Sequence, residues 1–156
     1  MKIRTPKELE VYKLAFDSAM KIFEISKSFP KEETYSLTNQ MRRSSRSACS
    51  NLAEAFRKRR YPKAFISKLS DSEGESAETQ TWIDFAASCQ YITSDIQEEL
   101  NSCYEKIIGK LINMSLHPEN WSWETAYYLL TNDFGYFLFT HASLILAGTD
   151  LEDLTI

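Results

Sequence analysis

Leu37 to Lys63, LTNQMRRSSRSACSNLAEAFRKRRYPK, is the stretch that decides the fold. Its apolar and small residues recur at steps of three and four, which is the period of one buried helix face. The predicted inward positions are Leu37, Met41, Ser44, Ala48, Leu52, Ala55 and Phe56. Small side chains in the middle of this set allow a second helix to approach closely. The stretch therefore predicts a helix from Leu37 to near Arg60 that packs tightly against a neighbour.

The next helix is predicted to begin at Pro62, because proline suits the first helical turn, and to end near Gln90. Its inward positions are also small in the middle: Phe65, Leu69, Ser72, Ser76, Thr79, Ile83 and Ala86. Gly74 costs about 1 kcal/mol relative to alanine in a helix interior, so we expect a packing reason for it. Two helices joined by a tight turn, each with a small-residue centre, predict one close antiparallel contact.

Two further amphipathic helices flank this pair. Thr5 and Glu8 form a capping-box pattern before a helix that ends near Pro30, and Thr93 caps another that ends near Pro118. The first has the stripe Leu9, Tyr12, Phe16, Ala19 and Phe23, widened by Val11, Ala15, Ile22 and Ile25, and the other has Ile96, Leu100, Cys103, Ile107, Leu111 and Met114. Four such helices with short connectors predict an all-α, up-down-up-down antiparallel four-helix bundle over residues 1–116.

Residues 117–156 form an aromatic-rich C-terminal extension of a different character. Tryptophan, tyrosine and phenylalanine crowd its first half, which is too apolar for a flexible tail. We expect short helices that pack on the bundle or on a neighbouring subunit. The alternative is that its rings stack on nucleic-acid bases, as aromatic side chains do on single strands.

The net charge of −4 is unevenly distributed along the chain. Residues 42–68 hold nine basic residues and one acid, Glu54, while the rest of the chain has an excess of twelve acids. Guanidinium groups suit phosphates because their planar fork donates two hydrogen bonds at once. The candidate nucleic-acid-binding residues are Arg42, Arg43, Arg46, Arg57, Arg60 and Lys63. The alternative is an ordinary salt-bridged face, with Arg43 or Arg46 paired to the acids Asp71, Glu73, Glu75 and Glu78.

A second polar set shares one face of the Leu37–Arg60 helix. Gln40, Ser44, Ser47, Asn51 and Glu54 recur at spacings of four, three, four and three. Ser72, Ser76, Thr79 and Gln80 on the next helix could answer them. One interpretation is a catalytic pocket. The other, which we favour, is a structural hydrogen-bond network through Gln40, Ser47, Asn51 and Glu54 that fixes the register of the bundle or of an assembly.

No pattern in the chain predicts catalysis, a metal or a cofactor. Three cysteines without a CxxC pair argue against a disulfide framework and a zinc site and favour a reducing, cytoplasmic compartment. No sequence rule brings either histidine to Cys49, and there is no Gly-rich phosphate loop. The charged N-terminus is no signal peptide, and the most apolar window, Phe134–Ala147, is too short to span a membrane. We therefore expect a protein that is not an enzyme and does not contact membranes.

Residues 9–115 resemble a known family, the 23S ribosomal RNA intervening-sequence proteins. Its pattern runs Pro, Glu-x-Tyr-x-Leu-x-x-Gln-x-Arg-Arg, Ser, Asn-x-Ala-Glu, a basic stretch and Phe-x-x-x-Leu. It matches Pro30, Glu33, Tyr35, Leu37, Gln40, Arg42, Arg43, Ser47, Asn51, Ala53, Glu54, Arg57, Lys63, Phe65 and Leu69, and it continues through Gly74, Glu78, the Trp82 region and Tyr91-Ile92. The chain departs from the pattern at Ala55, Asp71 and Gln80, where the family has glycine, an apolar residue and glutamate.

The resemblance implies an up-down four-helix bundle that assembles as a homopentamer, a tapered barrel around a central channel. A relative that accompanies diversity-generating reverse transcriptases binds nucleic acid through its basic surface and also binds its polymerase. The implied function is a homo-oligomeric accessory protein that binds RNA or DNA with a basic rim. The alternative is a scaffold whose basic rim docks an acidic protein partner without nucleic acid.

Overall fold

The computed structural model describes residues 3–121. The chain divides into two compact units, Met1–Ser122 and Trp123–Ile156, and the described residues belong to the first. The predictions for the aromatic extension lie outside the described residues from Ser122 onward.

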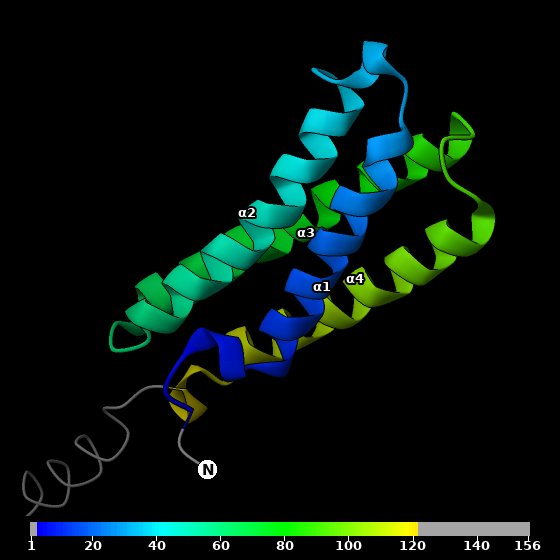
Figure 1. Cartoon of the computed structure of the whole chain (residues 1–156). Coiled ribbons are helices and arrows are strands. Elements are labelled where there is room, and N and C mark those ends of the chain that lie inside the picture. Colours follow the sequence, from blue (N-terminus) through cyan, green and yellow to red (C-terminus); the bar gives the residue numbers. More distant parts are fainter. Residues whose placement is uncertain (1–2, 122–156) are drawn as a thin grey trace, which may run out of the picture. The chain divides into compact units, whose positions relative to one another are not determined.

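Four long helices make up the described part of the chain (Figure 1). They are α1 (Glu10–Ile25), α2 (Leu37–Lys58), α3 (Pro62–Ser88) and α4 (Ser94–Leu116), with short 3-10 turns at Pro6–Glu8, Ser26–Ser28, Lys31–Glu33 and Pro118–Asn120. Helix α2 packs on α1 and α3, and α4 packs on α3 and α1. Residues 3–121 contain no strand. The predicted all-α, up-down-up-down four-helix bundle is confirmed.

The helix ends follow their local sequence signals closely. The Thr93 hydroxyl accepts a hydrogen bond from the Ile96 backbone N–H at 3.4 Å, which caps α4. The Thr5 backbone N–H donates to Glu8 Oε1 at 3.1 Å, so the predicted capping box forms. It closes the 3-10 turn Pro6–Glu8, however, and α1 begins only at Glu10.

The core of α2 and α3 matches the predicted inward positions. All seven predicted positions on α2 are buried, and the seven on α3 are the complete buried set of that helix. On α4 Cys103 was predicted to face the core, but it is not among the buried residues, and its neighbour Tyr104 is buried instead. On α1 the predicted stripe is wrong at Phe16, which is 49% exposed, whereas Val11, Ala15 and Ile22 are buried as predicted, together with Ser18.

Helices α2 and α3 approach each other very closely. The Ser72 hydroxyl of α3 donates to the backbone carbonyl of Ala48 on α2, with 2.7 Å between the oxygens. The hydroxyls of Ser44 and Thr79 lie 2.9 Å apart across the same contact. A short side chain can reach the backbone of a neighbouring helix only where both surfaces are small. The predicted close antiparallel contact is therefore present, and small residues make it possible.

Gly74 has no packing reason within the described chain. It is exposed, and a Cβ atom added to it would meet nothing within 4 Å. The expectation that close packing requires this glycine is wrong for contacts among the described residues of the chain.

Ser72 tests the tight contact, because its buried hydroxyl donates to the Ala48 carbonyl of α2. Ser72→Leu forces extra volume into this contact and should lower the free energy of unfolding by about 1–3 kcal/mol or more. Urea unfolding followed by circular dichroism measures the change. Ser102→Leu on the exposed side of α4 is the matched control and should change stability little. Equal effects of the two substitutions would contradict the tight packing.

Gly74 gives a second prediction of opposite sign. Gly74→Ala should stabilise the protein by about 0.5–1 kcal/mol, because alanine restricts the unfolded chain and meets no neighbour in the folded one. Ala77→Gly, at another exposed position of α3, should destabilise it by a similar amount. Thermal unfolding of both variants measures this. A destabilising Gly74→Ala would mean that a partner subunit packs on this face.

Candidate nucleic-acid interface

The outer face of α2 carries a stripe of basic residues. At about 100° per residue, Arg42, Arg46 and Arg57 fall within an arc of about 60° that also contains Asn39, and Ser50 extends that arc slightly. No acid of α2 lies in this arc, since Glu54 points farther round the helix. We call Arg42, Arg46 and Arg57 the basic stripe. A surface groove of about 500 Å³ runs along its first half, lined by Thr34, Thr38, Asn39, Arg42, Arg43, Arg46, Ser47 and Ser50.

Contacts with α1 and the turn that follows it position two of these arginines. Arg42 Nε donates to the Ser26 hydroxyl at 2.7 Å, and its guanidinium lies 5.0 Å from the centre of the Phe23 ring. The Arg46 guanidinium lies 5.7 Å from the same ring. Arg46 is exposed and makes no ion pair within residues 3–121. Both guanidinium groups therefore lie near the same aromatic ring of α1.

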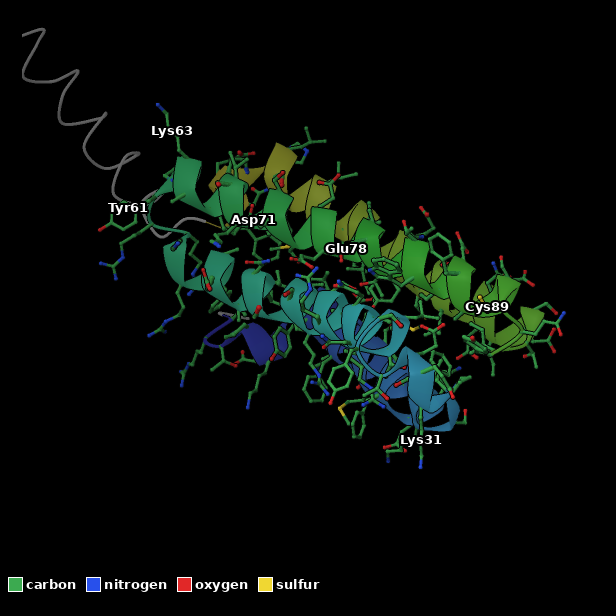
Figure 2. The ribbon with its side chains drawn as sticks, turned by 90° about the horizontal axis from the view of Figure 1, so that it is seen from above. Lys31, Tyr61, Lys63, Asp71, Glu78 and Cys89 are labelled. Carbon is green, nitrogen blue, oxygen red and sulfur yellow. The ribbon has the colours of Figure 1, made fainter. Side chains whose placement is uncertain are left out.

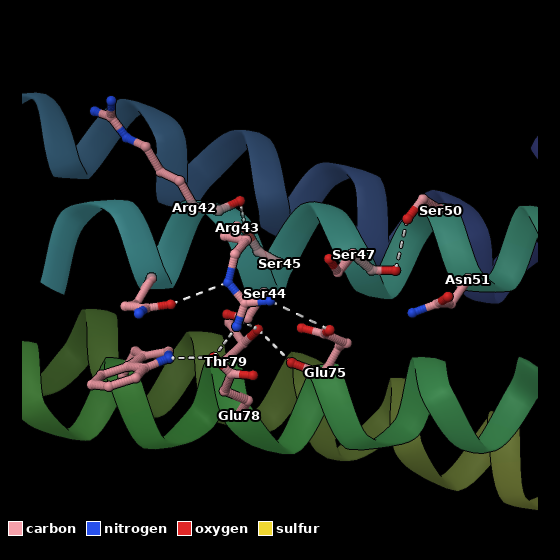
Figure 3. A network of polar contacts seen from close by, with 12 residues as sticks. Arg42, Arg43, Ser44, Ser45, Ser47, Ser50, Asn51, Glu75, Glu78 and Thr79 are labelled. Atoms are coloured by element: carbon pink, nitrogen blue, oxygen red, sulfur yellow. Dashed lines mark hydrogen bonds and ion pairs between the residues drawn. The ribbon is translucent and has the colours of Figure 1, made fainter. Parts of the chain in front are cut away.

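Arg43 belongs to a different set of contacts, although it adjoins Arg42 in sequence. Its Nη2 lies 2.6 Å from Glu78 Oε1, its Nη1 lies 3.7 Å from Glu75 Oε1, and its Nε donates to Gln40 at 3.1 Å (Figure 3). The alternative that we stated for Arg43, a salt bridge to the acids of the next helix, is thus what the structure contains. Its charge is compensated, so it contributes least to any anion site.

The remaining candidates lie at the other end of α2. Figure 2 shows Tyr61 and Lys63 at the α2–α3 turn, far from Lys31 at the opposite end of the bundle. Arg57 and Lys63 are exposed, and neither forms an ion pair within the described residues. The Arg60 guanidinium lies 6.0 Å from the Tyr61 ring. Arg46 and Arg57 are eleven residues apart, or about 16 Å along the helix axis, so the six predicted residues form two groups rather than one.

Sequence reasoning missed Arg59, which lies at the same turn. Its guanidinium stacks 3.5 Å from the centre of the buried Phe56 ring. Desolvation by burial, together with the neighbouring charge of Arg57, lowers the pKa of Arg59 from its usual range. Arg59 thus packs against the core while its neighbours face solvent.

The predicted polar residues join α2 to α3 in two places: Ser44 meets Thr79 in the core, and Asn51 and Glu54 make their contacts at the surface. Lys68 Nζ donates to Asn51 Oδ1 at 3.2 Å and lies 3.2 Å from Glu54 Oε2. Gln40 takes part through Arg43, whereas Ser47 participates only through its backbone carbonyl, which accepts from Ser50 at 3.1 Å. Gln80, expected to answer this set, instead donates to Glu105 of α4 at 2.8 Å.

Among the described residues, Cys49 is the candidate nucleophile, and clusters of His, Cys, Asp and Glu are the candidate metal ligands. Burial raises the pKa of the Cys49 thiol to about 11, so it stays protonated near neutral pH and is a poor nucleophile. No group of three or more His, Cys, Asp or Glu within residues 3–121 could hold a metal ion. None of the described helices is long and apolar enough to cross a membrane.

The end of the groove near Thr34 is held by Glu33. Its carboxylate accepts hydrogen bonds from the Leu37 backbone N–H at 3.2 Å, from the Ser36 hydroxyl, and from the Tyr91 hydroxyl at 3.3 Å. These hydrogen bonds, that of Ser36 first, lower the pKa of Glu33 below its usual range. Tyr91 follows α3 and its ring lies 5.5 Å from that of Phe29, so the two loops at this end hold each other in place.

Fold and surface together define a small four-helix-bundle protein whose second helix presents a basic face to solvent. The model of the 23S rRNA-intervening sequence protein family matches residues 7–113, and the chain belongs to that family. A similar solved structure is a protein of unknown function from the S23 ribosomal protein family of Bacteroides thetaiotaomicron VPI-5482. It is 26% identical, the match covers 67% of this chain and 97% of that chain, and the TM-score is 0.61. No curated protein matches. The family resemblance found from sequence motifs is confirmed.

Glu33 predicts a specific dependence on acid. Because its pKa is lowered in the folded state, its contribution to stability is present above the pKa of an unfolded glutamate, about 4.3, and is lost as the pH falls through the folded value. Glu33→Gln should therefore lower the melting temperature at neutral pH and make it less sensitive to acid below about pH 4.5. Glu32→Gln, at the exposed neighbouring carboxylate, is the control. If the melting temperature of Glu33→Gln fell with acid as steeply as that of the unmodified protein, the hydrogen bonds accepted by the Glu33 carboxylate would not contribute to stability.

Proposed function

We propose that this protein is a non-enzymatic, homo-oligomeric accessory protein that binds nucleic acid through the outer face of α2. The observation that carries the proposal is the basic stripe: Arg42, Arg46 and Arg57 share one solvent-facing arc of a helix. Arg46 and Arg57 form no ion pair within the described residues. Uncompensated guanidinium groups along one line suit a ligand with regularly spaced negative charges.

The spacing of the stripe suits a phosphate backbone. Phosphates follow one another about 3.4 Å apart along the axis of each strand of a duplex, so the 16 Å from Arg46 to Arg57 corresponds to about five nucleotides. Ser50 and Ala53, which lie between the two arginines on this face, have short side chains. A strand could therefore lie close to the helix between its two basic ends.

Assembly would strengthen this interaction. The family resemblance implies five copies, and five copies of a segment with eight excess positive charges would carry a formal charge of about +40. Linked copies bind a long polyanion more tightly than one copy does, because each later contact is intramolecular. The twelve excess acids in the rest of the chain limit the self-repulsion of such a ring. We therefore propose a homopentamer, with RNA or DNA as its partner.

Replacing the two uncompensated arginines tests the proposal directly. Arg46→Ala combined with Arg57→Ala should weaken binding to a structured RNA and reduce the slope of log affinity against log salt by about 2 per protomer that contacts it. Fluorescence anisotropy at several salt concentrations measures both effects. Arg42 is left unchanged because its guanidinium also donates a hydrogen bond to Ser26, so its replacement would change a contact within the fold. Lys13→Ala with Lys106→Ala removes two exposed charges from α1 and α4 and should have little effect.

Light scattering of the same variants measures the oligomeric mass independently of nucleic-acid binding. The arginine variant should keep the oligomeric mass of the unmodified protein, since its changes lie at the solvent face of α2. Affinity that is unchanged in the arginine variant would refute the proposal. Salt-dependent capture of an acidic protein, with no binding of RNA or DNA, would instead favour the scaffold function.

A further inference from the structure

Two highly exposed tyrosines bracket the basic stripe. Tyr35 is 91% exposed just before α2 begins at Leu37, and Tyr61 is 61% exposed just after α2 ends at Lys58. Single exposed rings are common on protein surfaces and need no explanation by themselves. These two differ because they flank the helix that carries the basic stripe, Tyr35 two residues before its start and Tyr61 three residues after its end.

The surroundings of the two rings differ. Tyr35 comes directly after Glu32, Glu33 and Thr34, and Thr34 lines the groove together with Arg42 and Arg46. Tyr61 has the Arg60 guanidinium 6.0 Å from its ring centre, and Figure 2 shows Tyr61 and Lys63 projecting from the same turn. The order along the surface is thus aromatic, basic, small, basic, aromatic. The 22 residues of α2 separate the rings by about 33 Å.

This order discriminates between paired and unpaired nucleic acid. A duplex presents phosphates to a basic helix, but its bases are stacked on each other and their faces cannot reach an exposed ring. An unpaired strand offers phosphates to arginine and free base faces to tyrosine at the same time. Tyrosine rings at both ends of the stripe add binding energy only for the unpaired strand.

We propose that the outer face of α2 binds an unpaired, single-stranded segment of nucleic acid, with Tyr35 and Tyr61 each stacking on a base while the basic stripe holds the phosphates between them. The proposal rests on the function proposed above and deepens it by naming the class of nucleic acid. Arg60 contributes a second planar surface beside Tyr61, since guanidinium groups also stack on rings.

The test compares single-stranded and duplex probes on the full chain. The probes are labelled oligo(dT) and oligo(U) of about 12 nucleotides, within the range that one small site occupies, and the duplexes of equal length made with their complements. The unmodified protein should bind the single strands more tightly than the duplexes. Tyr35→Leu and Tyr61→Leu should each weaken single-strand binding roughly tenfold and leave duplex binding unchanged. Tyr35→Phe and Tyr61→Phe keep the ring and should keep the affinity.

The outcomes separate this proposal from the one on which it rests. Equal affinity for single strands and duplexes, with leucine variants that bind as well as the unmodified protein, would overturn the stacking role. If Arg46→Ala with Arg57→Ala still abolished binding in that case, the nucleic-acid function itself would stand. Absence of salt-dependent binding to every probe would overturn both. Stronger binding to oligo(U) than to oligo(dT), or the reverse, with the tyrosine effect retained, supports the proposal and shows which of the two strands is preferred.

Discussion

The close contact between α2 and α3 is the constraint on which the rest of the structure depends. A hydroxyl of α3, that of Ser72, reaches the backbone carbonyl of Ala48 on α2, so no larger side chain fits between the two helices at that point. The contact fixes the rotation of α2 about its own axis. Once that rotation is set, Arg43 must face the acids of α3, while Arg46 and Arg57 must face solvent. Small residues buried in the middle of the bundle thereby decide which charges are available at its surface.

The electrostatic character of α2 therefore differs on its two sides. Toward α3, Arg43 and Lys68 face Glu75, Glu78 and Glu54, and the opposite charges compensate one another. Surface ion pairs of this kind contribute little to stability, about 0–1 kcal/mol each. On the other side the charges lie along the groove without acids among them on α2. A chain that is acidic overall can thus present a local positive field to a polyanion.

The inward faces of α2 and α3 could be predicted residue by residue, because small and apolar residues repeat there without competing candidates. The face of α1 could be predicted only in part, since Phe16 and Ala15 belong to two overlapping apolar stripes and the larger side chain is the exposed one. Arg43 and Arg46 could not be separated from sequence either. They are one helical turn apart, and which one meets an acid depends on the register between helices. Nothing periodic marked Tyr35 and Tyr61, because exposure in a connecting loop leaves no repeat in the sequence.

The contacts of Arg42 with Ser26 and Phe23 have a consequence for local unfolding. Helix α1 packs less extensively on its neighbours than α2 packs on α3, and two of its ties to α4, Lys21–Glu99 and Lys110–Glu10, are surface ion pairs. Such an element is the one expected to detach first, at a lower free energy than global unfolding. Detachment would release the Arg42 guanidinium from Ser26 and the Phe23 ring from beneath both arginines. A ligand in the groove that binds Arg42 and Arg46 in their folded positions would disfavour detachment of α1. Backbone hydrogen exchange along α1 would then slow when the groove is occupied.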